Sequence, residues 1–333
     1  MRILLADAFP DASRAELAQR GHDCRYEPTV TTEDLPQMVP GCEALVVRST
    51  RVPAAVLAAA DSLRLIVRAG SGTNTIDCAE AARRGVYVCN VPGRNAAAVA
   101  ELALGLLLAI DRRIPDNVTD LRQGRWNKKL YSQARGIQGR AIGILGLGSI
   151  GLAFAHRAAA FGADIYAVAK ANRDPATLDA AQAAGITFLD SAATLAATCD
   201  VLSVHVPGGE STRGLVSQDL LAQMQPGAIL LNTSRGDVVD EAALIEAMDS
   251  KGVRAGLDVF QEEPAAGTGA IDSTLARHPN VYGTHHIGAS TAQAQQAVAD
   301  GVVEIVEQFG AGTLLHCVNR PLESATAPVD SVT

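Results

Sequence analysis

Short apolar runs alternate with helical patterns along the first third of the chain. The apolar runs cover residues 3–6, 44–47, 65–68 and 86–90, and helical patterns cover residues 12–20 and 54–60. This alternation is typical of a parallel sheet whose strands are joined by crossover helices. The runs are apolar at consecutive positions, which indicates strands covered on both faces. We therefore predict that the chain begins with a flavodoxin-like α/β domain.

A second α/β series begins in the middle of the chain. Its apolar runs cover residues 141–145, 164–168, 201–205, 228–232 and 256–259. Helical patterns flank the series, over residues 95–113 before it and 291–309 after it. We therefore predict a Rossmann-type dinucleotide-binding domain, residues 96–287, inserted into a substrate-binding domain that consists of residues 1–95 and 288–333. The polar residues 323–333 are expected to form a frayed tail.

The composition is that of a globular protein and excludes several kinds of partner. The 333 residues are 48% hydrophobic and 19% charged, and the formal net charge is -8. An acidic chain has no bulk attraction for nucleic acid or for anionic membranes. The longest apolar stretch, residues 96–110, contains Glu101 and is too short to cross a membrane. The six cysteines are scattered without metal-ligand spacing, so we expect no metal site, and reduced thiols in a cytoplasmic protein.

A glycine-rich loop follows the first apolar run of the second series and precedes a helical pattern. The loop reads Gly146-Leu147-Gly148-Ser149-Ile150-Gly151. Glycines at this spacing allow a tight turn and a close approach of the backbone to a pyrophosphate, which then lies at a helix N-terminus. Taken alone, the motif is also compatible with an ordinary turn between a strand and a helix.

Three further polar segments, residues 232–241, 257–264 and 284–291, each follow a predicted strand. Because ligands in open α/β sheets collect at the carboxyl ends of the strands, we expect Arg235, Glu263 and His286 to converge there. An arginine at this edge suits a carboxylate, because its planar fork can bond both oxygens. A histidine backed by a glutamate suits proton transfer at neutral pH.

Each of these three residues also has a purely structural interpretation. Arg235 is within reach of an ion pair with Asp237 or Asp240. Glu263 is placed to cap a turn, and His286 can be a structural histidine. Their joint occurrence after a dinucleotide loop favours the catalytic interpretation.

The ordered set of motifs resembles that of the D-isomer-specific 2-hydroxyacid dehydrogenases, and most of all their phosphoglycerate dehydrogenases. The resemblance extends from about residue 1 to residue 318. It is carried by the glycine loop and by residues 68–72, 232–241, 258–264 and 286–291. It implies an enzyme that transfers a hydride between NAD or NADP and a small anionic 2-hydroxyacid or 2-oxoacid. It also implies a homodimer in which the apolar helix expected over residues 95–113 packs against a second subunit.

The resemblance assigns roles to the matching residues. Arg235 would hold the substrate carboxylate and polarise its carbonyl, and Glu263 would orient His286, the acid and base. Substrate contacts would come from Arg48 and Arg68, facing a distal phosphate, and from the backbone of Ser71 and Gly72. The cofactor would be bound by Gly146, Gly148, Ser149, Ile150, Gly151, Ala169, Lys170, Val206, Pro207, Thr212, Thr233, Ser234, Asp258 and Gly288.

Two positions depart from the family pattern. NAD-preferring members carry an aspartate where this chain has Ala169, and Lys170, Asn172 and Arg173 follow, which leaves NADP open as well as NAD. His285 stands where the family often has proline, but the Ile-Gly-Ala-Ser register after His286 favours His286 as the proton-transfer residue.

Several substrates and one different class of function stay open at this point. The arginines favour 3-phosphoglycerate and phosphohydroxypyruvate, which would place the enzyme in serine synthesis. Glyoxylate, hydroxypyruvate and an anionic oxoacid such as sulfopyruvate are alternatives, as is a corepressor-like protein that senses dinucleotides without catalysis. We find no C-terminal regulatory domain in the sequence and expect no serine feedback through such a domain.

Overall fold

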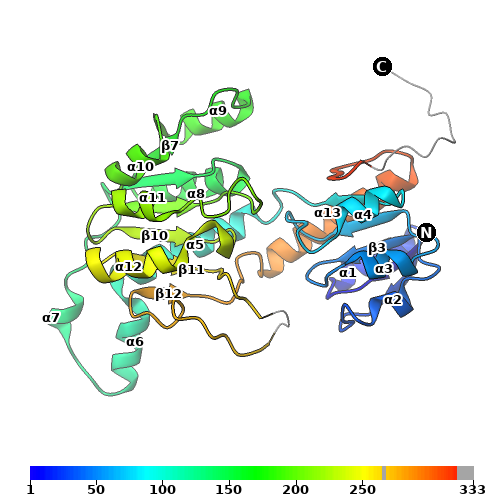
Figure 1. Cartoon of the computed structure of the whole chain (residues 1–333), viewed down its shortest axis with the longest axis horizontal. Coiled ribbons are helices and arrows are strands. Elements are labelled where there is room, and N and C mark those ends of the chain that lie inside the picture. Colours follow the sequence, from blue (N-terminus) through cyan, green and yellow to red (C-terminus); the bar gives the residue numbers. More distant parts are fainter. Residues whose placement is uncertain (265–267, 321–333) are drawn as a thin grey trace. The chain divides into compact units, whose positions relative to one another are not determined.

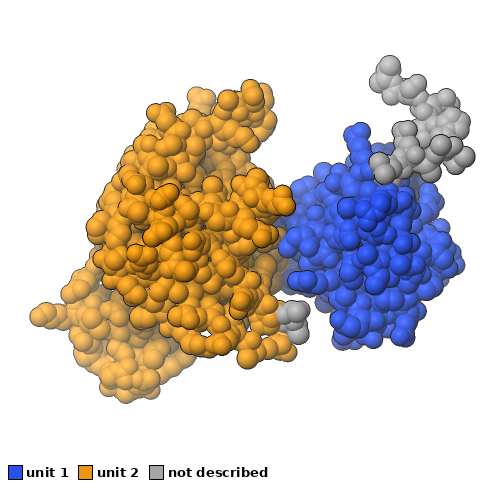
Figure 2. Space-filling view, viewed as in Figure 1, with its two compact units in different colours: residues 1–95, 292–333 blue, residues 96–291 orange. Residues whose placement is uncertain are grey.

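The computed structural model describes residues 1–264 and 268–320. The chain forms two compact units, one made of residues 1–95 and 292–333 (unit 1) and the other of residues 96–291 (unit 2) (Figure 2). The tail expected over residues 323–333 lies outside the described residues. Each unit has its own parallel sheet, and the helices of each unit are labelled in Figure 1.

Unit 1 contains a five-stranded parallel sheet in the order β2-β1-β3-β4-β5, which is the flavodoxin-like order. Helices α1 and α13 cover one face of this sheet, and α2, α3 and α4 cover the other. The strands β3 and β4 are apolar at nearly every position because both of their faces are covered. The elements are β1 (Arg2–Leu5), α1 (Asp11–Gln19), β2 (Asp23–Tyr26), α2 (Leu35–Met38), β3 (Ala44–Val47), α3 (Ala54–Ala59), β4 (Leu65–Arg68), α4 (Cys78–Arg83), β5 (Tyr87–Asn90) and α13 (Ala292–Gly310).

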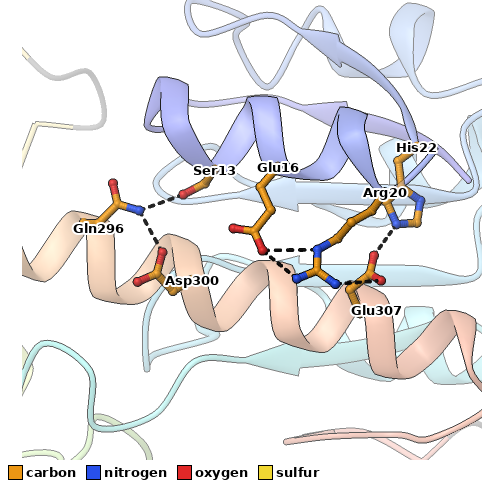
Figure 3. Close-up of polar contacts among 7 residues, drawn as sticks. All are labelled: Ser13, Glu16, Arg20, His22, Gln296, Asp300 and Glu307. Carbon is orange, nitrogen blue, oxygen red and sulfur yellow. Dashed lines mark hydrogen bonds and ion pairs between the residues drawn. The ribbon is translucent and has the colours of Figure 1, made fainter.

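Polar contacts join α13 to the N-terminal part of unit 1, although they are far apart in the sequence (Figure 3). Gln296 donates a hydrogen bond to Ser13 Oγ at 2.9 Å. At the other end of the helix, the Glu307 carboxylate contacts His22 Nε2 at 2.6 Å and Arg20 at 3.3 Å. The hydrogen bond with His22 is the main cause that lowers the pKa of Glu307 below its ordinary value.

We expect Glu307→Gln to lower the free energy of unfolding by about 1 kcal/mol at neutral pH, because the charged hydrogen bonds to His22 and Arg20 are lost. A carboxylate whose pKa is lowered by folding stabilises the protein above its ordinary pKa, and this stabilisation disappears as the pH falls. The difference between wild type and variant should therefore shrink in acid. Denaturant unfolding followed by circular dichroism at several pH values measures it.

Glu304→Gln on the same helix is the matched control. Glu304 pairs with Arg94 at 3.3 Å, but its side chain is 55% exposed. Such a pair contributes little, so the control should change stability by less than about 0.5 kcal/mol. Equal losses of unfolding free energy in the two variants would contradict the larger contribution expected from the contacts of Glu307.

Unit 2 contains a seven-stranded parallel sheet in the order β12-β11-β10-β9-β6-β7-β8. Starting from β6, this is the Rossmann order with one further strand at the edge, so the predicted fold class is confirmed. Helices α5, α8 and α9 cover one face, and α10, α11 and α12 cover the other. The elements are α5 (Ala96–Arg112), α6 (Ile114–Arg122), α7 (Lys128–Tyr131), β6 (Ala141–Leu145), α8 (Ser149–Ala160), β7 (Asp164–Val168), α9 (Pro175–Ala183), β8 (Thr187–Leu189), α10 (Ala192–Thr198), β9 (Val201–Val204), α11 (Gln218–Gln223), β10 (Ile229–Asn232), a 3₁₀ turn (Gly236–Val238), α12 (Glu241–Lys251), β11 (Arg254–Leu257) and β12 (Val281–Gly283).

The apolar helix α5 is covered mainly by its own unit. Leu106 and Ile110 lie against Gly256 of β11, and the helix packs beside α8. This burial accounts for most of its apolar character, and a narrow stripe that includes Glu101 and Gly105 stays exposed. Among the described residues, no helix is both long enough and apolar enough to cross a membrane.

Strand β11 begins and ends two residues before the expected run of residues 256–259. The strand starts at Arg254 because its backbone pairs with Ile229 of β10, and its guanidinium donates to the carbonyl oxygen of Ile110 at 3.1 Å. A charged side chain can be accommodated at the start of an otherwise apolar strand when it has a hydrogen-bond partner of this kind. Asp258 lies beyond the strand, and its carboxylate accepts hydrogen bonds from the backbone N–H groups of Ile287 and Gly288.

Candidate active site

The glycine loop has the local geometry of a dinucleotide fingerprint. Gly146 has φ +95°, and a Cβ atom there would lie 2.6 Å from the carbonyl carbon and oxygen of His205. A Cβ at Gly151 would lie 2.2 Å from the carbonyl oxygen of Gly146, so the first turn of α8 packs directly on the loop. By contrast, a Cβ at Gly148 would meet open space. The first and third glycines are therefore needed by the fold, and the second lies where a ligand can approach.

The N-terminus of α8 adds to this site. Gly148 is the N-cap and has no side chain to accept hydrogen bonds from the first turn. The N–H groups of Ser149, Ile150 and Gly151 have no partner within the helix, and the helix dipole makes this end positive. The loop lies at the point where the strand order of unit 2 reverses, between β6 and β9. Such reversal points are where open α/β sheets bind their ligands.

The end of β7 carries an arginine rather than a carboxylate. Arg173 donates to the carbonyl oxygen of Val168 at 3.0 Å and to that of Leu147 at 3.4 Å. Its guanidinium thereby connects the end of β7 to the glycine loop. Ala169 and the exposed Lys170 lie in the same turn. The next acidic residue after β7, Asp174, caps α9 through Thr177.

The loops after β9 and β10 bring further predicted residues to the same edge of the sheet. Val206 and Pro207 follow β9, and the hydroxyl of Thr212 donates to the Pro207 carbonyl at 2.6 Å. After β10, Thr233 and Ser234 are 8% exposed. The Thr233 hydroxyl is buried and has no hydrogen-bond partner among the described residues, so it is available to a bound molecule.

Arg235 is held at this edge by its neighbours. Its guanidinium donates to the carbonyl oxygen of Ser234 at 2.6 Å, and its aliphatic part lies against Gly208. Among the described residues, Arg235 forms no ion pair with Asp237 or Asp240. Asp237 pairs with Arg213 at 3.8 Å, and Asp240 caps α12.

Glu263 and His286 form a direct pair across 23 residues of sequence. His286 Nδ1 lies 2.7 Å from one oxygen of the Glu263 carboxylate, and the other oxygen accepts from the backbone N–H of Phe260 at 3.1 Å. The Glu263 carboxylate therefore caps a turn and also contacts the histidine, so the structural and the catalytic interpretation of this residue are compatible. Burial acts to raise the pKa of Glu263, but the His286 and Phe260 hydrogen bonds and the charge of Arg235 lower it overall. Arg235 is therefore within electrostatic range of Glu263.

Asp258 shapes the turn that presents His286. Its carboxylate accepts hydrogen bonds from Thr284 Oγ1 at 2.6 Å and from the N–H groups of Ile287 and Gly288, each at 2.8 Å. His286 itself has φ +52°, a left-handed conformation that costs energy for most residues. These hydrogen bonds hold the turn in that conformation. With Nδ1 bound to Glu263, the opposite nitrogen, Nε2, takes no hydrogen bond from the described residues.

The predicted substrate residues of unit 1 lie at the carboxyl ends of the neighbouring strands β3 and β4. Arg48 follows β3, where the strand order of unit 1 reverses between β1 and β3. Arg68 ends β4, and its guanidinium folds over Gly70, whose φ is +143°. Ser71 and Gly72 continue this turn, and the Ser71 carbonyl accepts a hydrogen bond from Asn90 at 2.5 Å.

Two polar side chains that organise the loops after β1 and β10, Asp7 and Asn232, were not predicted from the sequence. Asp7, directly after β1, accepts hydrogen bonds from the N–H groups of Arg48, Ser49 and Thr50 at 2.6, 3.0 and 3.1 Å. Asn232 binds both Ser234 and the Arg235 carbonyl. Their position immediately after, or at the end of, an apolar run is the signal that could have identified them.

Comparison with known proteins agrees with this geometry. The family model for the D-isomer specific 2-hydroxyacid dehydrogenase, NAD binding domain, matches residues 104–288. The chain belongs to the D-isomer specific 2-hydroxyacid dehydrogenases. Like other members of this family, it is an oxidoreductase that uses NAD or NADP and acts on the hydroxyl group of a 2-hydroxyacid.

Relatives within the dehydrogenase family carry different names. A hydroxypyruvate reductase of Thermotoga maritima is 41% identical over 83% of this chain and 87% of that protein. A D-3-phosphoglycerate dehydrogenase of Mycobacterium tuberculosis is 42% identical over 93% of this chain, which spans 57% of that protein. Among solved structures, an NADPH-dependent glyoxylate/hydroxypyruvate reductase of Sinorhizobium meliloti, in complex with NADP and malonate, has a TM-score of 0.78 and 30% identity, covering 98% of this chain and 99% of that one.

Proposed function

We propose that this dehydrogenase acts in the cytoplasm and interconverts 3-phosphoglycerate and phosphohydroxypyruvate. The observation that carries the proposal is the placement of Arg48 and Arg68 at the ends of two adjacent strands of unit 1. Two guanidinium groups suit a dianionic phosphate better than a small uncharged substituent. The similarity to the mycobacterial phosphoglycerate dehydrogenase supports this choice, and unit 1 is then the substrate-binding domain.

The catalytic roles follow from the contacts within unit 2. Arg235 binds the substrate carboxylate and polarises the carbonyl group next to it. Glu263 fixes the proton on His286 Nδ1, so Nε2 gives a proton to the carbonyl oxygen in reduction and takes one from the hydroxyl in oxidation. Bound nicotinamide supplies or accepts the hydride at the reacting carbon. In unit 1, the N–H groups of Ser71 and Gly72 are the further substrate contacts that we propose.

The described residues fit a dinucleotide. We propose that Gly146, Gly148 and the first turn of α8 bind its pyrophosphate, and that the orphaned hydroxyl of Thr233 bonds to it near the nicotinamide half. Ser234, Val206, Pro207, Thr212 and Gly288 line the same strand ends. Asp258 contributes through the turn around His286, because its carboxylate is occupied there.

We infer that NADP(H) is accepted as well as NAD(H), because the turn after β7 has no carboxylate at position 169 to repel a 2′-phosphate. Introducing Ala169→Asp should raise the ratio of kcat/KM for NADH over NADPH roughly tenfold or more. The new carboxylate accepts from the ribose hydroxyls and repels the phosphate. Initial rates with both cofactors, together with their dissociation constants from fluorescence titration, measure the change.

Ala183→Asp is the control for added negative charge, since Ala183 is exposed on α9 away from the end of β7. It should leave the cofactor ratio unchanged. An unchanged ratio in Ala169→Asp would instead show that position 169 does not face the adenosine ribose.

A homodimer is the assembly that we propose. Helices α6 and α7 and the segment between them, residues 114–131, are here called the arm and extend from the sheet of unit 2 (Figure 1). The arm exposes apolar side chains, among them Trp126 at 80%, Leu121 at 56% and Ile114 at 48%. Such a group of apolar residues is typical of a protein interface, and a twofold pair would cover it.

Light scattering should give the mass of a dimer. The double substitution Trp126→Ser and Leu121→Ser should lower the measured mass toward that of the monomer.

The substrate is tested by comparing rates with phosphohydroxypyruvate, hydroxypyruvate, glyoxylate and sulfopyruvate. Arg68→Met should raise KM for phosphohydroxypyruvate roughly tenfold or more and leave that for glyoxylate nearly unchanged. Arg64→Met, at the opposite end of β4, is the matched control.

A preference for hydroxypyruvate, the substrate in the name of the Thermotoga relative, would contradict the phosphorylated substrate but leave the proposed catalytic residues unchanged. Tight dinucleotide binding without turnover of any oxoacid would favour the corepressor-like alternative.

A further inference from the structure

Two cysteines face each other across the edge of the unit 1 sheet. The edge strand β5 pairs in antiparallel fashion with the segment after α13, and Cys89 lies opposite Cys317. Asn90 N–H donates to the His316 carbonyl at 3.2 Å, and Val318 N–H donates to the Val88 carbonyl at 2.8 Å. These two hydrogen bonds flank the cysteine pair, which is therefore a non-hydrogen-bonded pair of an antiparallel ladder.

This type of pair brings side chains closest together. Its Cα atoms are typically about 4.5 Å apart, which lies within the range of about 4.4–6.8 Å spanned by disulfides. Both side chains belong to the same apolar cluster, between the sheet and α13. Burial raises the pKa of the Cys89 thiol, and the neighbouring Cys317 adds to that rise. Both cysteines are free thiols in this structure.

The segment that carries Cys317 is fixed in its register. Asn319 is 8% exposed, and its amide oxygen accepts from Val88 N–H at 2.6 Å. Its amide nitrogen donates to the carbonyl oxygens of Val86 at 3.0 Å and Cys78 at 3.2 Å. The thiol of Cys317 donates to the Asn319 carbonyl. The two cysteines are thus held opposite each other and do not meet by chance.

We propose that Cys89 and Cys317 are a redox modification site, which a hydroperoxide converts into a cross-strand disulfide. Cys317 is the half-buried member and reacts first, whereas Cys89 is fully buried. The Cys317 sulfur attacks the O–O bond and becomes a sulfenic acid, and the peroxide leaves as water or an alcohol. The Cys89 sulfur then attacks the Cys317 sulfur; the S–S bond forms, the S–O bond breaks, and a second oxygen leaves as water. Two thiols lose two electrons and two protons, and one peroxide is reduced.

Burial determines the character of this pair. It raises the pKa of Cys89 to about 12, chiefly by desolvation. A thiol of high pKa is a slow attacking group and a poor leaving group. The disulfide should therefore form slowly and, once formed, should resist reduction by small thiols. It would fasten the C-terminal segment to β5 and close a long loop, which restricts the unfolded chain.

The test uses the full chain treated with hydrogen peroxide, blocked with N-ethylmaleimide and digested with trypsin without reductant. We expect the peptide Gly85–Arg94, which contains only Cys89, to be linked to the peptide that begins at His278 and contains only Cys317. A phosphine reductant should separate the two peptides. The thermal midpoint of the oxidised protein should rise above that of the reduced protein.

Matched variants decide the assignment. Cys317→Ser and Cys89→Ser should each abolish the link and the rise in midpoint. Cys199→Ser should abolish neither, although Cys199 is also buried and its pKa is also raised to about 12. If Cys89→Ser fails to fold, Cys317→Ser and the wild-type peptide map are sufficient. Oxidation of Cys317 with Cys89 still free, or a link from Cys317 to Cys78, would overturn the proposal.

Discussion

His286→Asn is expected to lower kcat roughly 10³-fold in both directions, because the proposed mechanism gives His286 the exchange of the substrate proton. Asparagine suits this test, since it tolerates the left-handed backbone that His286 adopts at φ +52°. The turn around Asp258 should therefore persist, and the dissociation constant for the dinucleotide should change by less than about twofold. Stopped-flow and steady-state rates, with cofactor titration of the same preparation, separate the two effects.

His285→Asn is the matched control for this experiment. His285 is adjacent and exposed, and it was the alternative candidate for proton transfer. It has no contact with Glu263 comparable to the 2.7 Å bond of His286. We expect the His285 variant to keep nearly wild-type turnover. The reverse pattern would move the acid and base role to His285.

Arg235→Lys is expected to lower kcat/KM about 10²-fold, even though the positive charge is kept. Lysine presents a point charge and cannot bond both oxygens of a carboxylate in one plane. The backbone should be unaffected, because Asn232 binds the carbonyl oxygen of residue 235 rather than its side chain. Weaker binding of the carboxylate should raise KM, and weaker polarisation of the carbonyl in the transition state should lower kcat. Steady-state kinetics with phosphohydroxypyruvate and with glyoxylate measures both parameters.

Arg213→Lys controls for the same substitution elsewhere in unit 2. Arg213 is 71% exposed and pairs only loosely with Asp237. Its replacement should leave kcat/KM within about twofold of wild type. If Arg235→Lys also left kcat/KM within about twofold of wild type, Arg235 would not bind the substrate carboxylate, and its purely structural interpretation would be favoured.

The sequence predicted the central strands well and the edge strands poorly, for a physical reason. Strands β3, β6 and β9 are covered on both faces and therefore show continuous apolar runs. Strands β2, β8 and β12 lie at sheet edges and are half-exposed, so their residues are mixed and no run was recognised. Strand β5 is also an edge strand, but the segment around Cys317 covers it, and its run was found.

The candidate site shows a similar division. Residue types and their position after strands predicted that Arg235, Glu263 and His286 meet, because parallel strands end at one edge of a sheet. The role of Asp258 could not be predicted in this way. Its carboxylate binds backbone N–H groups of a turn that is irregular and has a left-handed residue, and no periodic pattern encodes such a turn. The contact of Asp258 with the cofactor stays a prediction, and the structure adds that its carboxylate holds the turn that contains His286.

The composition of the unit 1 core has a consequence for synthesis of the chain on the ribosome. All five strands of that sheet are complete once Asn90 has been made, yet one face depends on Val302, Val306 and their neighbours on α13. About 200 residues separate the two, so at usual elongation rates the nascent sheet waits roughly 10–40 s for its cover. Unit 2 is contiguous and can fold in that interval. The first unit to emerge is therefore the last to be completed, and during that delay its uncovered apolar face is a natural client for a chaperone.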